Sequence, residues 1–385
     1  MPRRLAPAVV LTASGFLGGF AAVAVFSPHT PVGAQSPLPP PPKSIDDTPA
    51  RGGTDALPSA TAPDRPAAVG QFDAVVQKVM PAVVSVDAAK PAARGKPAEE
   101  SGSGVLLRFD GFRGTYAVTN NHVVDGSRAV DITVTLYDGR ILTPDRVWTD
   151  PASDIAILRL TADGLPAAEV GDSDRMKPGH WVLAFGSPLG FNQTVTHGII
   201  SARDRGQVNL NNTIRIKEFL QSDAAINPGS SGGPLTDSAG RVIGINTAIA
   251  SGGAASTTFT GISFSIPINL VKRLGKELLE TGTVARGYLG LQMAPTLDAQ
   301  TALKLGLTRL RGALVESTYA GGPAVRGGVQ AGDLIQKVDG IEVRDENHFI
   351  NIVGSLPIGH TLRLTVWRNK QAKAVDLTIS DWPRK

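Results

Sequence analysis

Short apolar runs separated by turn residues dominate the chain from residue 71 to about residue 267. The runs are rich in Val, Ile and Leu, and Gly, Pro, Asn or Asp stands between them, which is typical of β-strands. Asp138 and Gly139 separate two such runs and predict a hairpin. So many strands at short spacing predict two antiparallel barrels or a sandwich. The runs are AVVSVDA, GVLLRF, TYAVTNNHVV, DITVTLYDGRIL, DIAILRL, WVLAFG, TVTHGIIS, FLQSDA, RVIGINTAI and ISFSIP.

Two segments of this region have helical periodicity instead. FDAVVQKVM, residues 72–80, predicts a short helix. NLVKRLGKELLETG, residues 269–282, predicts a longer one with Asn269 as its cap and Gly282 as its end. We interpret the longer helix as the boundary of a β domain that covers residues 71–282. Its apolar face consists of Leu270, Val271, Leu274, Leu278 and Leu279.

The remaining segment, residues 283–385, alternates strand and short helix. Two helical patterns stand among the strand runs, one within GALVESTYAGGPAVRGGVQAGDLIQKVDGIEV and the other in ENHFINIVGSL. The strand runs TLRLTVWRN and AVDLTIS follow. This pattern predicts a small α+β domain.

The N-terminal residues 1–34 indicate export. Arg3 and Arg4 precede an uncharged run of 22 residues, Leu5–Phe26. Such a run is either the core of a signal peptide, cleaved after Ala34, or an uncleaved membrane anchor. In either case the two arginines predict that the rest of the chain lies outside the cytoplasm.

A linker follows at residues 35–70, which are rich in Pro, Ala, Ser and Asp. This composition buries too little apolar surface to fold, and its prolines favour an extended spacer.

Composition excludes several classes of function. The net charge is only +4 and no basic run is interleaved with aromatic residues, so we expect no nucleic-acid partner. The chain has no Cys, which excludes disulfides, cysteine-ligated zinc and a thiol nucleophile. No pair of histidines has metal-ligand spacing, and we expect neither a metal nor another cofactor.

The segment INPGSSGGPL, residues 226–235, places three glycines and two prolines around Ser230 and Ser231. This composition excludes a helix and disfavours a strand interior. An ordinary surface turn uses the same residues. The alternative is a nucleophilic serine in a loop whose glycines let backbone N–H groups converge on an oxyanion. Gly229 and Ser231 would then supply the two donors.

A serine nucleophile needs a base that takes its proton and a carboxylate that orients the base. Among the six histidines, His122 is the one placed directly after an apolar strand and an Asn-Asn pair that can turn the chain. Asp154 precedes the apolar run IAIL, so we expect it to be half-buried and to need a hydrogen-bonding partner. The order His122, Asp154, Ser231, with separations of 32 and 77 residues, predicts a catalytic triad.

These segments carry a family resemblance. TNNHVV, SDIAIL and SDAAINPGSSGGPL resemble the three signatures of the HtrA, or Deg, family of trypsin-like serine proteases. The resemblance continues in GINTAI and GISFSIP and in a carboxy-terminal module similar to a PDZ domain, and it covers about residues 72–381. It implies a mostly β protein, with a trypsin-like double β-barrel followed by a small α+β PDZ domain.

By this resemblance His122 is the general base, Asp154 orients it, and Ser231 attacks the scissile carbonyl. The N–H groups of Gly229 and Ser231 form the oxyanion hole. The family usually has Asn before the nucleophile, where this chain has Ser230. We expect Ser230 to contribute mainly its backbone and to alter how easily the loop switches between competent and collapsed forms. Ser230 is also a rival nucleophile, although the GxSGG register favours Ser231.

Substrate-contacting residues are less clearly marked. Ile226 and Ile249 flank the nucleophile and predict a shallow apolar pocket for small aliphatic residues; the alternative is that both are core residues. RGYLGLQM, residues 286–293, resembles the carboxylate-binding loop of a PDZ domain, with a strand that accepts a peptide as an added strand. A packing domain without a ligand is the alternative. The PDZ positions are Tyr288, Leu289, Gly290 and Leu291, with Ile350 and Val353 as one pocket wall.

The resemblance implies a serine endopeptidase that cuts unfolded or exposed segments of exported proteins and is regulated by C-terminal peptides at its PDZ domain. Its role would be quality control or envelope stress signalling. A catalytically idle chaperone or peptide-binding scaffold is the alternative. The family implies a homotrimer formed near Phe72, unfolded or membrane-associated protein substrates, and a periplasmic location. A single PDZ module with an N-terminal apolar segment is most similar to the membrane-anchored branch, and soluble relatives with one PDZ domain remain open.

Overall fold

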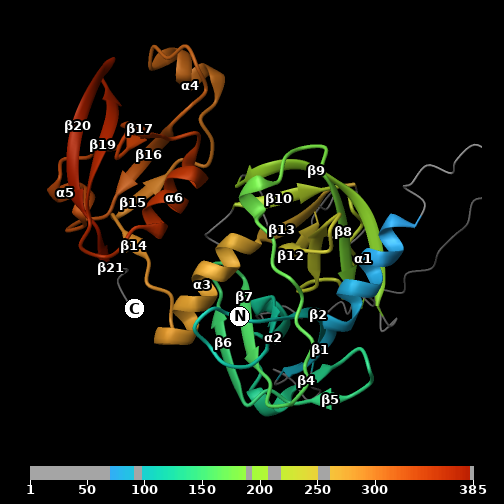
Figure 1. Ribbon diagram of the computed structural model, residues 1–385. Helices are drawn as coiled ribbons and strands as arrows, with labels where there is room; N and C mark the ends of the chain where they lie inside the picture. The colour runs from blue at the N-terminus through green and yellow to red at the C-terminus, as the bar shows by residue number, and fades with distance from the viewer. Residues whose placement is uncertain (1–69, 91–97, 188–192, 207–217, 250–260, 382–385) are drawn as a thin grey trace, which may run out of the picture. The chain divides into compact units, whose positions relative to one another are not determined.

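The computed structural model describes residues 70–90, 98–187, 193–206, 218–249 and 261–381. Strands predominate in these residues, as the apolar pattern predicts (Figure 1). The predicted signal or anchor, residues 1–34, and the linker up to residue 69 lie outside them. In the described part of the chain, no helix combines the length and the apolar character that crossing a bilayer requires.

The first half of the larger β region is a seven-stranded antiparallel sheet with the order β5-β4-β1-β2-β3-β7-β6. The predicted hairpin at Asp138 and Gly139 is confirmed, because Gly139 has a φ of 84° and its N–H donates to the Leu136 carbonyl between β4 and β5. The strands are β1 (Val83–Lys90), β2 (Ala98–Leu107), β3 (Tyr116–Thr119), β4 (Ile132–Thr135), β5 (Ile141–Leu142), β6 (Arg146–Asp150) and β7 (Ile155–Arg159).

The second half is a closed six-stranded barrel with the order β10-β13-β12-β11-β8-β9. The glycine-rich segment with Ser231 forms the connection from β10 to β11, so the barrel fixes both ends of that loop. The strands are β8 (Trp181–Gly186), β9 (Thr194–Arg205), β10 (Phe219–Ser222), β11 (Pro234–Asp237), β12 (Val242–Ile249) and β13 (Ser263–Pro267).

Helix α1 (Gln71–Val79) occupies the segment predicted to be helical near the start of the β region. Its residues Val75 and Val79 are buried with Leu183 and Phe185 of the barrel. The helix therefore belongs to the β region rather than to the linker.

Helix α3 (Ile268–Thr281) ends as predicted, since Gly282 has a left-handed φ of 80° and donates to the Leu278 carbonyl. The predicted cap is wrong. The helix begins directly after Pro267, so Asn269 lies in its first turn and its amide donates to Asp172 instead. The apolar face is buried in one core with residues of both β halves, which joins them: Leu270, Val271, Leu274 and Leu278 pack with Leu107, Ile157, Ile245 and Phe264.

The C-terminal domain consists of antiparallel sheet and helices, in agreement with the α+β prediction. The sheet has the order β15-β16-β17-β19-β20, with β18 paired to β17 and a separate β14-β21 pair. The sequence pattern missed α4, which is only six residues long. The elements are β14 (Gly287–Tyr288), β15 (Leu291–Met293), α4 (Ala299–Lys304), β16 (Ala313–Thr318), α5 (Pro323–Arg326), β17 (Leu334–Val338), β18 (Ile341–Glu342), α6 (Glu346–Ser355), β19 (Thr361–Arg368), β20 (Gln371–Thr378) and β21 (Ser380–Asp381).

Candidate active site

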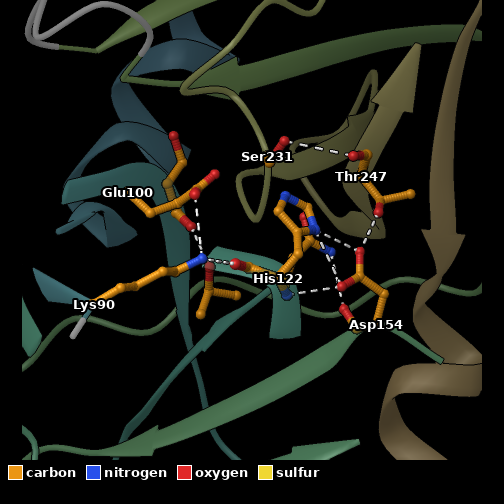
Figure 2. A network of polar contacts seen from close by, with 9 residues as sticks. Lys90, Glu100, His122, Asp154, Ser231 and Thr247 are labelled. Atoms are coloured by element: carbon orange, nitrogen blue, oxygen red, sulfur yellow. Dashed lines mark hydrogen bonds and ion pairs between the residues drawn. The ribbon is translucent and has the colours of Figure 1, made fainter. Parts of the chain in front are cut away.

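Asp154 lies in the turn between β6 and β7, with a left-handed φ of 58°. It is only 2% exposed, and so more deeply buried than the sequence predicts. Three donors satisfy its carboxylate (Figure 2): the main-chain N–H of His122 at 2.9 Å, the His122 Nδ1 at 2.9 Å and the Thr247 Oγ1 at 2.6 Å. Because a buried carboxylate needs such donors, they explain how the turn tolerates it.

His122 follows β3 in the single-turn helix α2 (Asn121–Val124). The two preceding asparagines fix this turn to the carbonyl of Asp154, which accepts from the Asn121 N–H and from the Asn120 side-chain amide, each at 3.1 Å. The predicted change of direction at the strand end is therefore confirmed, and it also places the base against its carboxylate.

Asp154 determines both the orientation and the charge of the imidazole. Burial disfavours the charged ring, but the hydrogen bond and the negative charge of Asp154 outweigh it and raise the pKa of His122 above its usual 6.5. Glu100 raises this pKa further and Lys90 lowers it. Since Nδ1 faces Asp154, the ring presents Nε2 as the nitrogen that can accept a proton.

Ser231 lies on the loop between β10 and β11, and Figure 2 shows the His122 ring directed toward it. The hydroxyl of Ser231 donates to the main-chain carbonyl of Thr247 at 3.5 Å, a long hydrogen bond. The three residues predicted from separate motifs are thus gathered at one place, between the seven-stranded sheet and the barrel.

The backbone before Ser231 is arranged around Gly229, which has a φ of 94° that favours glycine. Ser230 closes the turn, since its N–H donates to the Asn227 carbonyl at 2.8 Å. Among the described residues, no hydrogen bond engages the N–H of Gly229 or that of Ser231. Within the described chain, both predicted oxyanion donors are therefore without an acceptor.

Ser103 of β2 fastens this loop to the first sheet. Its buried hydroxyl donates to the Gly229 carbonyl at 2.6 Å and accepts from the Ser187 N–H at 2.7 Å. Its own N–H donates to the Ser231 carbonyl at 2.7 Å. The Gly229 carbonyl shares its peptide plane with the N–H of Ser230, and the Ser231 carbonyl shares its plane with the N–H of Gly232. Ser103 therefore fixes the peptide units that directly follow Gly229 and Ser231, the residues with the candidate oxyanion donors.

The two predicted specificity residues differ in what the structure shows of them. Ile226 is 4% exposed and packs with Ile200, Leu220 and Leu235 in the barrel core, which favours the core alternative for this residue. Ile249 ends β12, and its side chain lies outside the described ones.

In the C-terminal domain, the predicted peptide-binding residues lie in β14, in the turn that follows it, at the start of β15 and on α6. Gly290 has a φ of 73° in the turn between β14 and β15, and Leu289 is buried in the domain core. Leu291 begins β15, which is an edge strand of the sheet and therefore has a side without a strand partner in the described chain. On α6, Val353 is buried in the core and Ile350 is partly buried against it.

No group of three His, Cys, Asp or Glu residues is placed to hold a metal ion within the described residues.

Comparison with known proteins gives the family. A trypsin-like peptidase domain matches residues 102–245 and a PDZ domain matches residues 287–379. The chain is similar to the solved structure of the HtrA-type protease AlgW with tripeptide, with a TM-score of 0.69 and 37% identity over 82% of this chain and 98% of that one. The chain belongs to the HtrA family. Its match to the serine endoprotease from Yersinia pestis is weaker, with a TM-score of 0.58 and 30% identity, covering 81% and 98% of the two chains.

Curated relatives of this HtrA-family protein are named as probable periplasmic serine endoproteases of the DegP-like type. The relative from Halomonas elongata is 40% identical over 297 residues, which is 76% of this chain and 59% of that protein. The relative from Pseudomonas putida is 39% identical over 292 residues, 75% of this chain and 58% of that protein. The chain thus matches less than two thirds of the length of these relatives.

The site of this HtrA-family protein includes residues that motif reading missed. Thr247 lies in GINTAI, where a buried hydroxyl in an apolar strand is a signal for a hydrogen-bonding role. Ser103 lies in SGSG, whose small residues permit close approach: a Cβ added at Gly102 would lie 3.1 Å from the Ser231 carbonyl oxygen. No local pattern indicates the contact of Lys90 with the His122 carbonyl.

Proposed function

We propose that this HtrA-family protein is a serine endopeptidase that uses His122, Asp154 and Ser231. The observation that carries the proposal is the shared position of the three, with Nδ1 of His122 hydrogen-bonded to a buried Asp154 and the ring directed toward Ser231. The family match and the names of the curated relatives support the same activity.

We propose the following reaction at these residues. When a peptide binds, the Ser231 hydroxyl exchanges its long bond to Thr247 for one to His122 Nε2, as catalytic hydrogen bonds often tighten only with substrate. Ser231 Oγ bonds to the scissile carbonyl carbon while its proton passes to Nε2. The oxyanion accepts hydrogen bonds from the N–H groups of Gly229 and Ser231. Nε2 then protonates the leaving amine, the C–N bond breaks, and water releases the acyl group by the same steps.

The C-terminal domain is proposed to bind peptides that end in a free carboxylate. The turn at Gly290 would receive the carboxylate, and the peptide would extend along the edge strand β15. The titles of the similar AlgW structures name a tripeptide and a decapeptide, which supports peptide binding in this kind of protein. The side chains of Leu291 and Ile350 are partly buried, and we propose that they line the peptide groove.

Substrates are proposed to be unfolded or exposed segments of exported or membrane-associated proteins. The periplasmic names of the relatives and the apolar run at residues 5–26 support a periplasmic location. Tethering by that run remains a proposal, and so does cleavage after Ala34. Mass spectrometry of the mature N-terminus distinguishes the two, because a tethered protein keeps Arg3 and Arg4.

A homotrimer is proposed as the assembled form. Phe72, Trp181 and His197 form a cluster with ring centroids 5.5 to 6.0 Å apart, and Trp181 is 53% exposed. A large aromatic cluster left exposed on a monomer is typical of an interaction surface. The number of subunits comes from the family resemblance.

The experiment compares casein cleavage by the parent protein and by Ser231→Ala. We expect kcat to fall by about 10⁶, because removal of a triad serine removes the nucleophile. Ser230→Ala is the matched variant and should keep measurable activity. Peptides with a free and an amidated C-terminus are added in parallel, and only the former should change the rate. Equal cleavage by the parent and Ser231→Ala would contradict the triad and favour the idle scaffold.

A further inference from the structure

Lys90 contacts the catalytic candidate His122 from the side opposite to Asp154 (Figure 2). It is the last residue of β1, and its Nζ donates to the main-chain carbonyl of His122 at 2.8 Å. The same Nζ pairs with Glu100 of β2 at 3.2 Å. One ammonium group therefore joins the His122 backbone to a carboxylate on the neighbouring strand.

The His122 carbonyl needs such a partner. Helix α2 has four residues, and the last four carbonyls of any helix have no partner within it. The N–H of His122 is already bound to Asp154 Oδ1 at 2.9 Å. With Lys90 on the carbonyl, both polar groups of the His122 backbone are anchored, one by each charged neighbour.

Glu100 on β2 limits the effect that the positive charge of Lys90 has on the His122 ring. Three charged side chains influence His122: Asp154 from the β6–β7 turn, Lys90 from β1 and Glu100 from β2. Lys90 alone would oppose protonation of the ring, and Glu100 alone would favour it. The pair is partly shielded from water, since the Lys90 side chain is 23% exposed and that of Glu100 is 45% exposed.

We propose that Lys90 is a positioning residue that holds the backbone of His122. Glu100 balances the charge of Lys90, so that this charge does not disturb the base. This inference rests on the proposed triad. Only the loss of Lys90 should displace the His122 backbone. The loss of Lys90 and the loss of Glu100 should change the protonation of the His122 ring in opposite directions.

The test measures kcat and the pH profile of kcat/KM for a peptide substrate in K90M, E100Q and the double variant. In K90M the hydrogen bond to the His122 carbonyl is lost and Glu100 is unbalanced, so we expect kcat to fall about tenfold. The acid limb of the kcat/KM profile should move to higher pH, because the remaining Glu100 charge favours the protonated ring. In E100Q the hydrogen bond to the His122 carbonyl is kept and Lys90 is unbalanced, so the acid limb should move to lower pH while kcat stays near the parent value. The double variant should restore the limb but keep the low kcat.

Lys78→Met is the matched control, because Lys78 also pairs with a glutamate, Glu169, and also donates to a main-chain carbonyl, that of Ala239. It lies outside the network of Figure 2, so its kcat and acid limb should equal those of the parent. Limbs that move in the same direction in K90M and E100Q, or an unchanged kcat and limb in both, would overturn the proposal. If the parent is active and Ser231→Ala is not, such a result leaves the proposed function intact.

Discussion

At the scale of single residues, the arrangement around Asp154 decides how the site responds to pH. One buried carboxylate accepts from the His122 backbone, the His122 ring and Thr247. The ring is thereby fixed in the tautomer with a proton on Nδ1, which leaves Nε2 as the base. Because the pKa of His122 is raised, more of the ring is protonated near neutral pH than in a free histidine.

This shift has opposite consequences for activity and for stability. The neutral ring is the base, so we expect kcat/KM to rise with pH through a midpoint above 6.5. The folded state gains stability from the raised pKa, and this gain is complete below the unfolded value of 6.5 and is lost as pH rises through the folded pKa. The rate profile and an NMR titration of the ring in Ser231→Ala should give the same midpoint, and a midpoint below 6.5 would contradict the assignment.

At the scale of elements, helix α3 depends on a close approach at Gly275. A Cβ added there would lie 2.4 Å from Phe109 Cε1 and 3.1 Å from Ile157 Cδ1. By helix propensity alone, Ala at a helix interior is better than Gly by up to about 1 kcal/mol. The clash should outweigh that gain, because overpacking a core costs about 1–3 kcal/mol.

We therefore expect Gly275→Ala to lower the free energy of opening of α3, measured by hydrogen exchange of its amides. Gly354→Ala in α6 is the matched variant, since its added Cβ would have no heavy atom within 4 Å apart from its chain neighbours and the backbone of its own helix. There the propensity term acts alone, and the opening free energy of α6 should rise or stay unchanged. A stabilised α3 in Gly275→Ala would show that Phe109 can move aside.

The two ends of helix α3 show which element boundaries the local sequence can predict. Gly282 ends α3 as predicted, because a left-handed residue at that position is a local requirement. Asn269 does not cap the helix, because β13 ends at Pro267 and the chain enters the first turn of α3 directly at Ile268. The partner of the Asn269 side chain is Asp172, which is far away in the sequence, and no local pattern indicates it.

At the scale of the whole molecule, the cluster of Phe72, Trp181 and His197 leaves Trp181 53% exposed in the single chain. If it is the trimer contact, the double variant F72A/W181A should sediment as a monomer at concentrations where the parent is a trimer. Buried aromatic anchors often contribute 2 kcal/mol or more each to an interface, which is enough to separate the two states.

Tyr137→Ala provides the control for that experiment, because Tyr137 is also aromatic and 56% exposed but belongs to no such cluster in the described residues. It should leave the sedimentation unchanged. A parent protein that is monomeric at all concentrations, or a double variant that still forms trimers, would remove the proposed contact.

The sequence by itself determined the strand-rich β region, the α+β domain after it, and the three motifs with His122, Asp154 and Ser231. These features depend on alternation, turn chemistry and side-chain type within a few residues, which the chain carries locally. The triad's catalytic role stays a prediction until a variant is assayed. Only the tertiary structure decided that Ile226 is in the core, that Thr247 and Ser103 support the site, and that Lys90 reaches His122. Those contacts join residues from different strands, and the folded arrangement of the sheet and the barrel sets which of them meet.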